Sequence, residues 1–219
     1  MGAAIQQLSL KKYKSVALTT YITSYCSILD NTLTLNGETV WTSDTPLFAD
    51  FSKKAYQHLE LQYPKFFKMD ALSKLAFLAS ELLLTTLPGN TYEGTTALLF
   101  SNRSSSLDTD MKYQQSIADK KEYYPSPAVF VYTLPNIGMG EISIRNGLKS
   151  ENSFFIFEAF NSEFMTNYAN LLIETGKATA VLCGWVELYQ EEYRAFMYLV
   201  SKEGIKIHNQ ENLENLYNR

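Results

Sequence analysis

Apolar and polar residues alternate along this chain in blocks that predict both helices and strands. The clearest helix follows Asp70, in ALSKLAFLASELLLTTL, where apolar residues recur at three- and four-residue spacing and Asp70 can cap the first turn. That segment is apolar on nearly every side, so we expect it to be buried. Weaker helical patterns cover residues 50–61 and 110–124, and a strong one covers residues 164–175 and ends at Gly176.

Short apolar runs bounded by turn residues predict strands at residues 14–20, 95–100, 153–158, 178–187 and 195–200. Asn36-Gly37 separates TLTL from ETVW and predicts a two-residue hairpin. Strands that alternate with helices indicate an α/β fold, with a mainly parallel or mixed sheet and helices packed on it. Because no linker rich in Pro, Gly or Ser divides the chain, we expect one domain over residues 1–219.

The amino-acid composition indicates a folded chain and argues against several classes of function. Hydrophobic residues make up 46% of the chain and charged residues 19%, as is usual for globular proteins. The formal charge is 19 − 23 = −4 and no basic block occurs, so we do not expect nucleic-acid binding, which needs clustered Lys and Arg. No apolar run reaches the roughly 18 residues of a membrane span. The start, MGAAIQQLSLKKYKS, has no apolar core of a secretory signal, so we expect a cytoplasmic protein.

Few residues offer obvious chemistry. Cys26 and Cys183 lie far apart in the sequence, as do His58 and His208, and none has the spacing of metal ligands. We therefore expect no metal and no cofactor, with Cys183 as a small buried residue and both histidines on the solvated surface. Aromatic residues reach 14%, which favours a buried interface with a partner.

Residues 125–187 carry the most specific pattern. It consists of Pro135, Asn136, Gly140, Ile142, Ile144, Gly147 and Leu148, the apolar run 153–158, the helical run 163–174, and then Gly176, Gly184, Trp185 and Glu187. This order resembles the β-ketoacyl synthases, in which such a segment leads to a strand that ends in the nucleophilic Cys. The resemblance covers about residues 75–200, with Trp185 where the family has a second glycine. It implies an α/β chain that forms the first half of a thiolase-like fold.

The resemblance also implies that this chain is catalytically silent. The position of the family's nucleophile falls at Ala159, within Glu158-Ala159-Phe160, and a methyl group cannot attack a thioester. The family's catalytic His pair belongs to a second half, which we do not expect this chain to contain. At the degenerate elbow we expect Glu158 to be a hydrogen-bonded structural carboxylate, with a general base as the alternative.

Some members of the family, the chain length factors, are silent subunits that pair with a competent synthase and shape its acyl tunnel. The resemblance implies that role here, as in pathways to aryl polyene and flexirubin-type pigments, with a full-length β-ketoacyl synthase as the heterodimer partner. The family's interface strand corresponds to Ser153, Phe154, Phe155, Ile156 and Phe157. The tunnel wall corresponds to Val129, Phe130, Thr133, Leu134 and Ile137, with Met111, Gln114 and Gln115 where tunnel depth is set. Half of a two-lobed fold leaves an apolar face uncovered, so we expect the isolated chain to self-associate.

Two other functions stay open. One is a homodimeric scaffold that binds acyl-carrier protein, which the charge of −4 disfavours because carrier proteins are acidic. The other is a thioester hydrolase that uses Ser104, Ser105 or Ser162, although the matching region has no His to act as base. Residues 102–106 lack the glycine spacing of a phosphate-binding loop and are interpreted as a turn after a strand.

Overall fold

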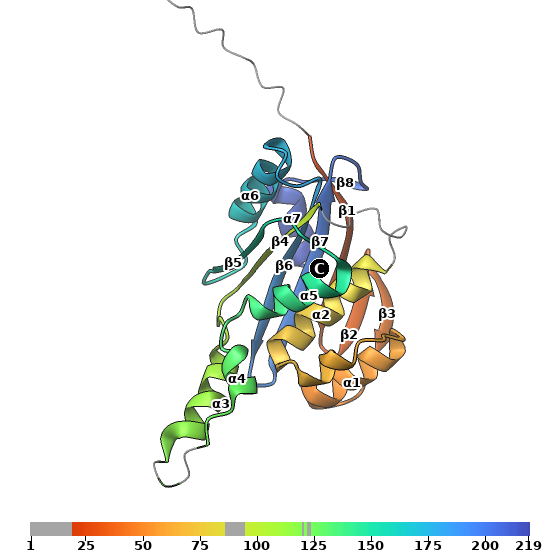
Figure 1. Ribbon diagram of the computed structural model, residues 1–219. Coiled ribbons are helices and arrows are strands. Elements are labelled where there is room, and N and C mark those ends of the chain that lie inside the picture. Colours follow the sequence, from red (N-terminus) through yellow and green to blue (C-terminus); the bar gives the residue numbers. More distant parts are fainter. Residues whose placement is uncertain (1–18, 86–94, 120, 122–123) are drawn as a thin grey trace, which may run out of the picture.

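A single mixed sheet with helices on both faces forms the body of the protein (Figure 1). The computed structural model describes residues 19–85, 95–119, 121 and 124–219. The strands run in the order β3-β2-β1-β7-β6-β4-β5, and β8 pairs with β1. Their bounds are β1 Tyr21–Leu29, β2 Thr32–Leu35, β3 Glu38–Thr42, β4 Thr96–Asn102, β5 Asn152–Ile156, β6 Ala180–Tyr189, β7 Glu192–Ser201 and β8 Lys206–Ile207.

Parallel pairing is confined to one side of the sheet. β4 runs parallel to both β5 and β6, whereas the other described pairs are antiparallel. Because parallel strands point the same way, the carboxyl ends of β4, β5 and β6 lie at one edge, where α/β proteins commonly build their sites. β5 is the last strand on this side, and among the described residues it pairs with β4 alone.

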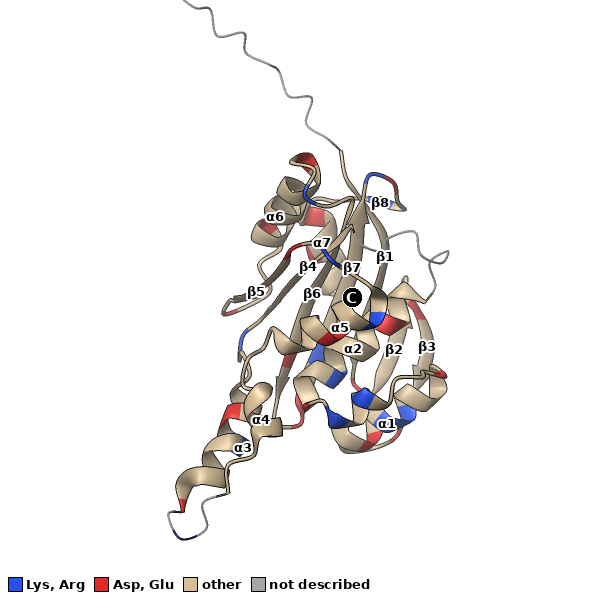
Figure 2. Ribbon diagram, in the orientation of Figure 1, with Lys and Arg blue, Asp and Glu red and all other residues tan. Residues whose placement is uncertain are grey.

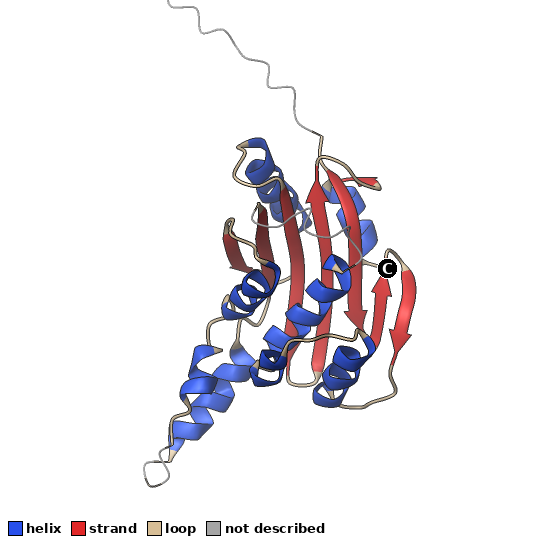
Figure 3. Cartoon of the chain, turned by 45° about the vertical axis from the view of Figure 1, so that its right-hand side comes forward, coloured by secondary structure: helices blue, strands red, loops and turns tan. Residues whose placement is uncertain are grey.

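Two hydrophobic cores occupy the two faces of the sheet. The first lies beneath α1 (Phe48–His58), α2 (Ala71–Leu84) and α5 (Ile137–Asn146), and the second lies beneath α6 (Ser162–Glu174) and α7 (Gln210–Tyr217) (Figure 3). The 3₁₀ helix η1 (Pro64–Lys68) leads into α2. Leu75, Phe77 and Leu83 of α2 are fully buried on different sides of the helix, as its apolar pattern predicts. No helix in the described part of the chain is both long and apolar enough to cross a membrane.

Two short helices project from the body at the lower end of the view (Figure 1). They are α3 (Leu107–Ala118) and α4 (Pro127–Val131), and together with residues 132–134 they are called the arm. The Thr109 hydroxyl donates to the Asp70 carboxylate at 2.6 Å, and the Ser106 hydroxyl donates to the Thr133 carbonyl. The first bond fixes the base of the arm to the start of α2, and the second joins the start of α3 to the residues that follow α4.

Most of the expected elements are confirmed. Asp70 caps α2 by accepting the Ser73 N–H at 2.9 Å. Asn36 and Gly37 form the turn between β2 and β3 with φ angles of 51° and 91°, a left-handed backbone that these residues tolerate well. Gly176 follows α6 with a φ of 72°. The expected end of the first long helix at Pro88-Gly89-Asn90 falls outside the described residues.

The expected first strand, residues 14–20, falls mostly outside the described residues. Only residues 19 and 20 of it are described, and β1 begins just after them, at Tyr21. β1 pairs with both β2 and β7, so it lies inside the sheet and buries both faces, with Cys26 in the first core and Tyr25 in the second. A strand buried on both faces lacks the alternation of apolar and polar residues that marks a strand with one exposed face. The sequence pattern of β1, which also contains several polar residues, therefore did not identify it as a strand.

The segment around His208, which we expected on the solvated surface, folds against the sheet. Asn209 accepts the Asn212 N–H at 2.8 Å and begins α7. Leu213 and Leu216 are spaced by about one turn and are buried in the second core. The few apolar residues of this segment therefore suffice to fold it onto the sheet.

Candidate functional site

The elbow, residues 157–160, joins the end of β5 to the start of α6 at the edge where the parallel strands end. The Phe157 N–H donates to the Asn102 carbonyl at 2.9 Å, which holds the elbow beside β4. The side chains of Glu158 and Ala159 are exposed. This is the strand-turn-helix geometry that the sequence predicts for the position of the missing nucleophile.

A cleft of about 860 Å³ lies over the elbow and the ends of β4 and β6. Its described lining includes four aromatic residues, four carboxylates, two arginines and two serines, together with Leu107 and Ala159, but neither Cys nor His. Its size is that of a small-molecule site.

Glu187 organises the turn that follows β4. Its carboxylate accepts the N–H groups of Arg103 at 2.6 Å and Ser104 at 3.1 Å. The Asn102 side chain accepts the Ser105 N–H at 2.9 Å and donates to the Ser105 carbonyl at 2.8 Å. The run is therefore a closed turn after a strand, as expected, and Glu187 has a structural part in it.

The expectation for Glu158 is wrong. Its carboxylate is exposed and forms no hydrogen bond or ion pair with another described residue. An exposed carboxylate is solvated by water and needs no structural partner. Buried carboxylates with such partners lie elsewhere. Glu81 of α2 accepts from Arg145 Nε of α5 at 3.3 Å, and Glu141 of α5 pairs with Lys65 Nζ of η1 at 2.8 Å.

The described thiols and imidazoles lie away from the cleft. Burial raises the pKa of Cys26 to about 12 and also raises the pKa of Cys183, so both thiols stay protonated. Cys183 is a small buried residue, as expected. His208 is buried, against expectation, because α7, which follows it, packs on the second core. Its Nδ1 lies 2.9 Å from Asn170 Oδ1. His58 is exposed, as expected.

The serines of the hydrolase hypothesis have no imidazole beside them. Ser162 is buried at the start of α6, and its hydroxyl donates to the Glu214 carboxylate at 2.7 Å. Ser104 and Ser105 line the cleft, but no hydrogen bond joins a serine to a histidine in the described part of the chain. A nucleophile–base pair of the kind that acyl transfer requires is therefore not formed by the described residues.

An aromatic stack joins the elbow to the end of α7. The rings of Phe160 and Tyr217 are 4.6 Å apart at 27°, and the Arg194 guanidinium lies 3.7 Å from the Tyr217 ring centroid. Arg194 also donates to the Tyr217 carbonyl. Trp185 meets Phe160 edge-on at 6.2 Å. Sequence analysis does not single out Arg194 or Tyr217. The helical spacing of Leu213, Leu216 and Tyr217 could have indicated Tyr217 as part of a packed helix, whereas no such signal marks Arg194.

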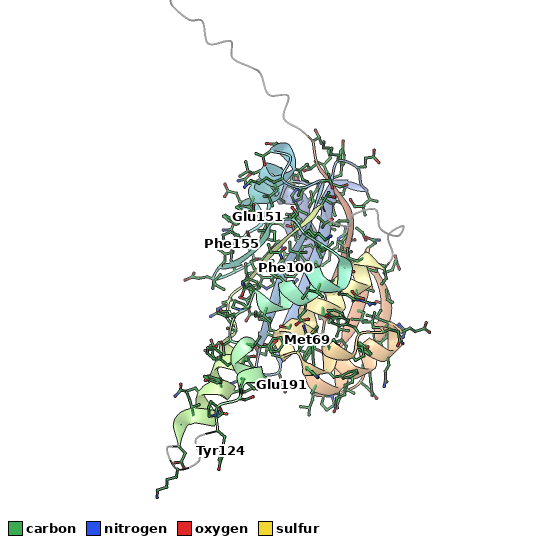
Figure 4. All side chains as sticks on the ribbon, viewed as in Figure 1. Met69, Phe100, Tyr124, Glu151, Phe155 and Glu191 are labelled. Carbon is green, nitrogen blue, oxygen red and sulfur yellow. The ribbon has the colours of Figure 1, made fainter. Side chains whose placement is uncertain are left out.

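The predicted interface strand lies at the open edge of the sheet. Phe154 borders the first core and Phe155 the second, and both keep part of their surface exposed. Ile156 is 50% exposed, and Ser153 and Phe157 are half-buried. Figure 4 places Phe155 at the margin of the molecule. β5 thus carries apolar side chains on both faces of an unpaired edge.

The residues assigned to the tunnel wall lie on the arm and at the start of α5. Phe130 and Leu134 are each 57% exposed, and Met111 is exposed beside Gln114 and Gln115. Val129, Thr133 and Ile137 are half-buried. Figure 2 shows that α4 and β5 carry no charged residue. Within the arm, α4 exposes apolar surface without the charges that usually protect it, and so does the edge strand β5, whereas α3 carries Asp108, Asp110 and Lys112.

Comparison with known proteins bears on the fold. No family model and no curated sequence matches the chain. A structure of the ishigamide ketosynthase/chain length factor is similar, with a TM-score of 0.62 and 18% identity over 84% of this chain and 62% of that one. The chain has the ketosynthase fold. The expected mixed α/β architecture of thiolase-like type is thereby confirmed.

Two further structures share this ketosynthase fold. One is the ketosynthase ApeO in complex with its chain length factor ApeC from Xenorhabdus doucetiae, with a TM-score of 0.55 and 15% identity over 85% of this chain and 80% of that one. The other is AntDE:AntF, a type II acyl-carrier protein in complex with its ketosynthase, with a TM-score of 0.59 and 14% identity over 91% of this chain and 65% of that one. The chain thus spans less than two thirds of the length of the ishigamide and AntDE chains.

Proposed function

We propose that this chain is a non-catalytic subunit that pairs with a full-length β-ketoacyl synthase and helps to shape its acyl tunnel, as a chain length factor does. The observation that carries the proposal is the open apolar edge of β5, beside an elbow that presents Ala159 where the family has its nucleophile. Similar structures named as ketosynthase and chain length factor complexes support it. Biosynthesis of a polyene or polyketide, in the cytoplasm, is the proposed setting.

The edge of β5 is suited to pairing with a strand of another subunit. Its outer row of backbone N–H and C=O groups has no partner strand among the described residues. An exposed edge is usually protected by charges or by Pro, and NSFFI contains neither. Addition of a partner strand would satisfy the backbone groups and bury Phe155 and Ile156.

The arm is the proposed contribution to the acyl tunnel. An acyl chain is apolar, so its tunnel needs apolar walls, and Phe130 and Leu134 offer such surface on a projecting element. Met111 of α3 adds to this surface. Packed walls tolerate little added volume, so bulk on the arm would limit the length of the product.

The test is co-expression with a full-length β-ketoacyl synthase from the same organism, followed by native mass spectrometry. We expect a 1:1 complex. Ile156 and Ile207 are each 50% exposed, on β5 and β8, so they form a matched pair for a charge substitution. Ile156→Lys is expected to abolish the complex because it places a charge at the paired edge, whereas Ile207→Lys is expected to leave it intact.

A homodimeric scaffold would give a different result. It predicts a dimer of the chain alone, broken by Ile156→Lys, and binding of acyl-carrier protein without any synthase. A chain that never binds a ketosynthase, or a complex that survives Ile156→Lys, would refute the proposed pairing through β5.

A further inference from the structure

Three buried side-chain polar atoms on one face of the sheet have no hydrogen-bond partner among the described residues. They are Thr166 Oγ1, Arg194 Nε and His208 Nε2. On the same face, the buried Tyr198 hydroxyl has only the Cys183 thiol, a weak hydrogen-bonding group, as its partner. The first core contains no unpartnered atom of this kind in the described part of the chain. The second face therefore buries polar groups to which the described side chains offer few hydrogen bonds.

The segment that closes this face is residues 206–217, which form β8 and α7 and are called the strap. β8 has two residues, and α7 buries only Leu213 and Leu216. By contrast, α2 of the first face buries eleven of its residues. The strap thus brings little apolar burial to the second face, in which these polar atoms are buried.

Polar contacts at both ends hold the strap in place. At its start, His208 Nδ1 and the Thr20 hydroxyl meet the same Asn170 side-chain oxygen of α6, at 2.9 Å and 2.6 Å. At its end, the Arg194 guanidinium packs on the Tyr217 ring, which in turn stacks on Phe160 of the elbow. The strap is therefore anchored on α6 at one end and on the elbow at the other.

We propose that the strap opens as a unit while the sheet and the first core stay folded. Opening lets the unpartnered atoms reach water, which offsets part of the lost burial of Leu213 and Leu216. It also separates Tyr217 from Phe160 and so frees the elbow. The strap is in this view a detachable cover of α6 and of the elbow cleft, and the inference is independent of the proposed partner.

The two cysteines report on the two faces separately. Cys183 is fully buried in the second core, whereas Cys26 is fully buried in the first core, where its thiol donates to the Ala79 carbonyl. Labelling of the native chain with N-ethylmaleimide, followed by peptide mass spectrometry, is expected to modify Cys183 at least about tenfold faster than Cys26. Equal rates would mean that both thiols react through global unfolding, and would overturn the proposal.

A variant at the end of the strap sharpens the test. Tyr217→Ala removes the stack with Phe160 and is expected to speed labelling of Cys183 by at least about tenfold, with that of Cys26 unchanged. Asn215→Ala, on the exposed side of α7, is the control and should change neither rate. Should Tyr217→Ala not fold, hydrogen exchange of the unaltered chain decides the matter. Exchange in α6 and α7 that is faster than in α2 supports the opening, and slower exchange contradicts it.

Discussion

At the scale of single residues, burial keeps the imidazole of His208 uncharged over a wider range of pH than in the unfolded chain. His208 lies under the body of the chain, and burial lowers its pKa to about 4. A histidine in the unfolded chain accepts a proton near pH 6.5. The folded state therefore resists a proton that the unfolded state takes up, so acid favours unfolding.

This difference predicts a pH-dependent loss of stability. Between pH 6.5 and pH 4 the unfolded chain carries more protons at His208, so the free energy of unfolding should fall by about 3 kcal/mol and then level off below pH 4. Urea unfolding at pH 7, 5.5 and 4 measures the fall. His208→Asn should reduce the pH dependence by about that amount and His58→Asn should not. An unchanged slope in His208→Asn would contradict the assignment.

The same residue shows what sequence patterns omit. The residues that follow His208 are polar, and its partners Asn170 and Thr20 are distant in the chain, so the local sequence does not indicate its burial. The prediction for Glu158 was wrong in the opposite sense, because Glu158 was expected to be a hydrogen-bonded structural carboxylate and is exposed. A resemblance in sequence gives the position of a residue in the fold but not its exposure. By contrast, Asp70 was predictable as a cap, because capping depends on the next few residues alone.

At the scale of elements, the contact between α2 and α5 depends on one glycine. A Cβ at Gly138 would lie 3.0 Å from Ser73 Oγ and 3.2 Å from Ser73 Cα, closer than a side chain normally packs. At Gly140, in the same helix, a Cβ would meet nothing within 4 Å. The two glycines therefore separate the cost of a close approach from the cost of glycine within a helix.

Two alanine substitutions test this. Gly138→Ala should lower the free energy of unfolding by about 1–3 kcal/mol, since the backbones of α2 and α5 must move apart. Gly140→Ala should raise it by up to about 1 kcal/mol, because alanine favours the helix. Thermal unfolding of both variants measures the effects. Changes of the same sign would show that the approach at Gly138 does not limit the packing.

A buried ion pair also holds these two helices together. Glu81 of α2 accepts from Arg145 Nε at 3.3 Å and from Asn146 Nδ2 at 3.2 Å, and its carboxylate is almost fully buried. Removal of one partner leaves the other charge uncompensated, which costs more than loss of the pair.

A double-mutant cycle measures that coupling. Arg145→Met should destabilise the chain by about 2 kcal/mol, less than a fully buried pair because Arg145 is about one third exposed. The double variant Glu81→Leu/Arg145→Met should be more stable than the sum of the two single effects predicts. Strict additivity in urea unfolding would mean that the pair contributes nothing to the attachment of α5.

The limits of prediction at this scale are those of long-range pairing. The periodicity of α2 and α6 and the turn at Asn36-Gly37 are local and are confirmed. The pairing of β1 with β7 joins residues far apart in the chain, and only the fold reveals it. The helix of the strap was not predicted for the same reason, because its two leucines are buried only by residues of the second core that are distant in the chain.

At the scale of the whole molecule, apolar exposure is uneven. Both faces of the sheet carry helices, and α7 helps to close the second core. Large exposed apolar side chains occur on β5, on the arm and on α5, where Ile144 is 69% exposed, but also elsewhere, as at Phe67, Leu171 and Ile205. The edge position of β5, rather than apolar exposure alone, therefore directs the proposed partner to the β5 side. Pairing needs this edge, whereas control of product length needs the arm.

Control of length can be tested without disturbing pairing. Thr133 is half-buried at the base of the arm, and its hydroxyl donates to the Phe130 carbonyl at 2.7 Å. In the complex with the synthase, Thr133→Phe should shorten the acyl products, because the added ring narrows a wall that tolerates little extra volume. Thr133→Val removes the hydroxyl without added bulk and should leave product length unchanged. Mass spectrometry of carrier-bound products reads both. A 1:1 complex of Thr133→Phe with unaltered products would refute the tunnel role of the arm and leave the pairing standing.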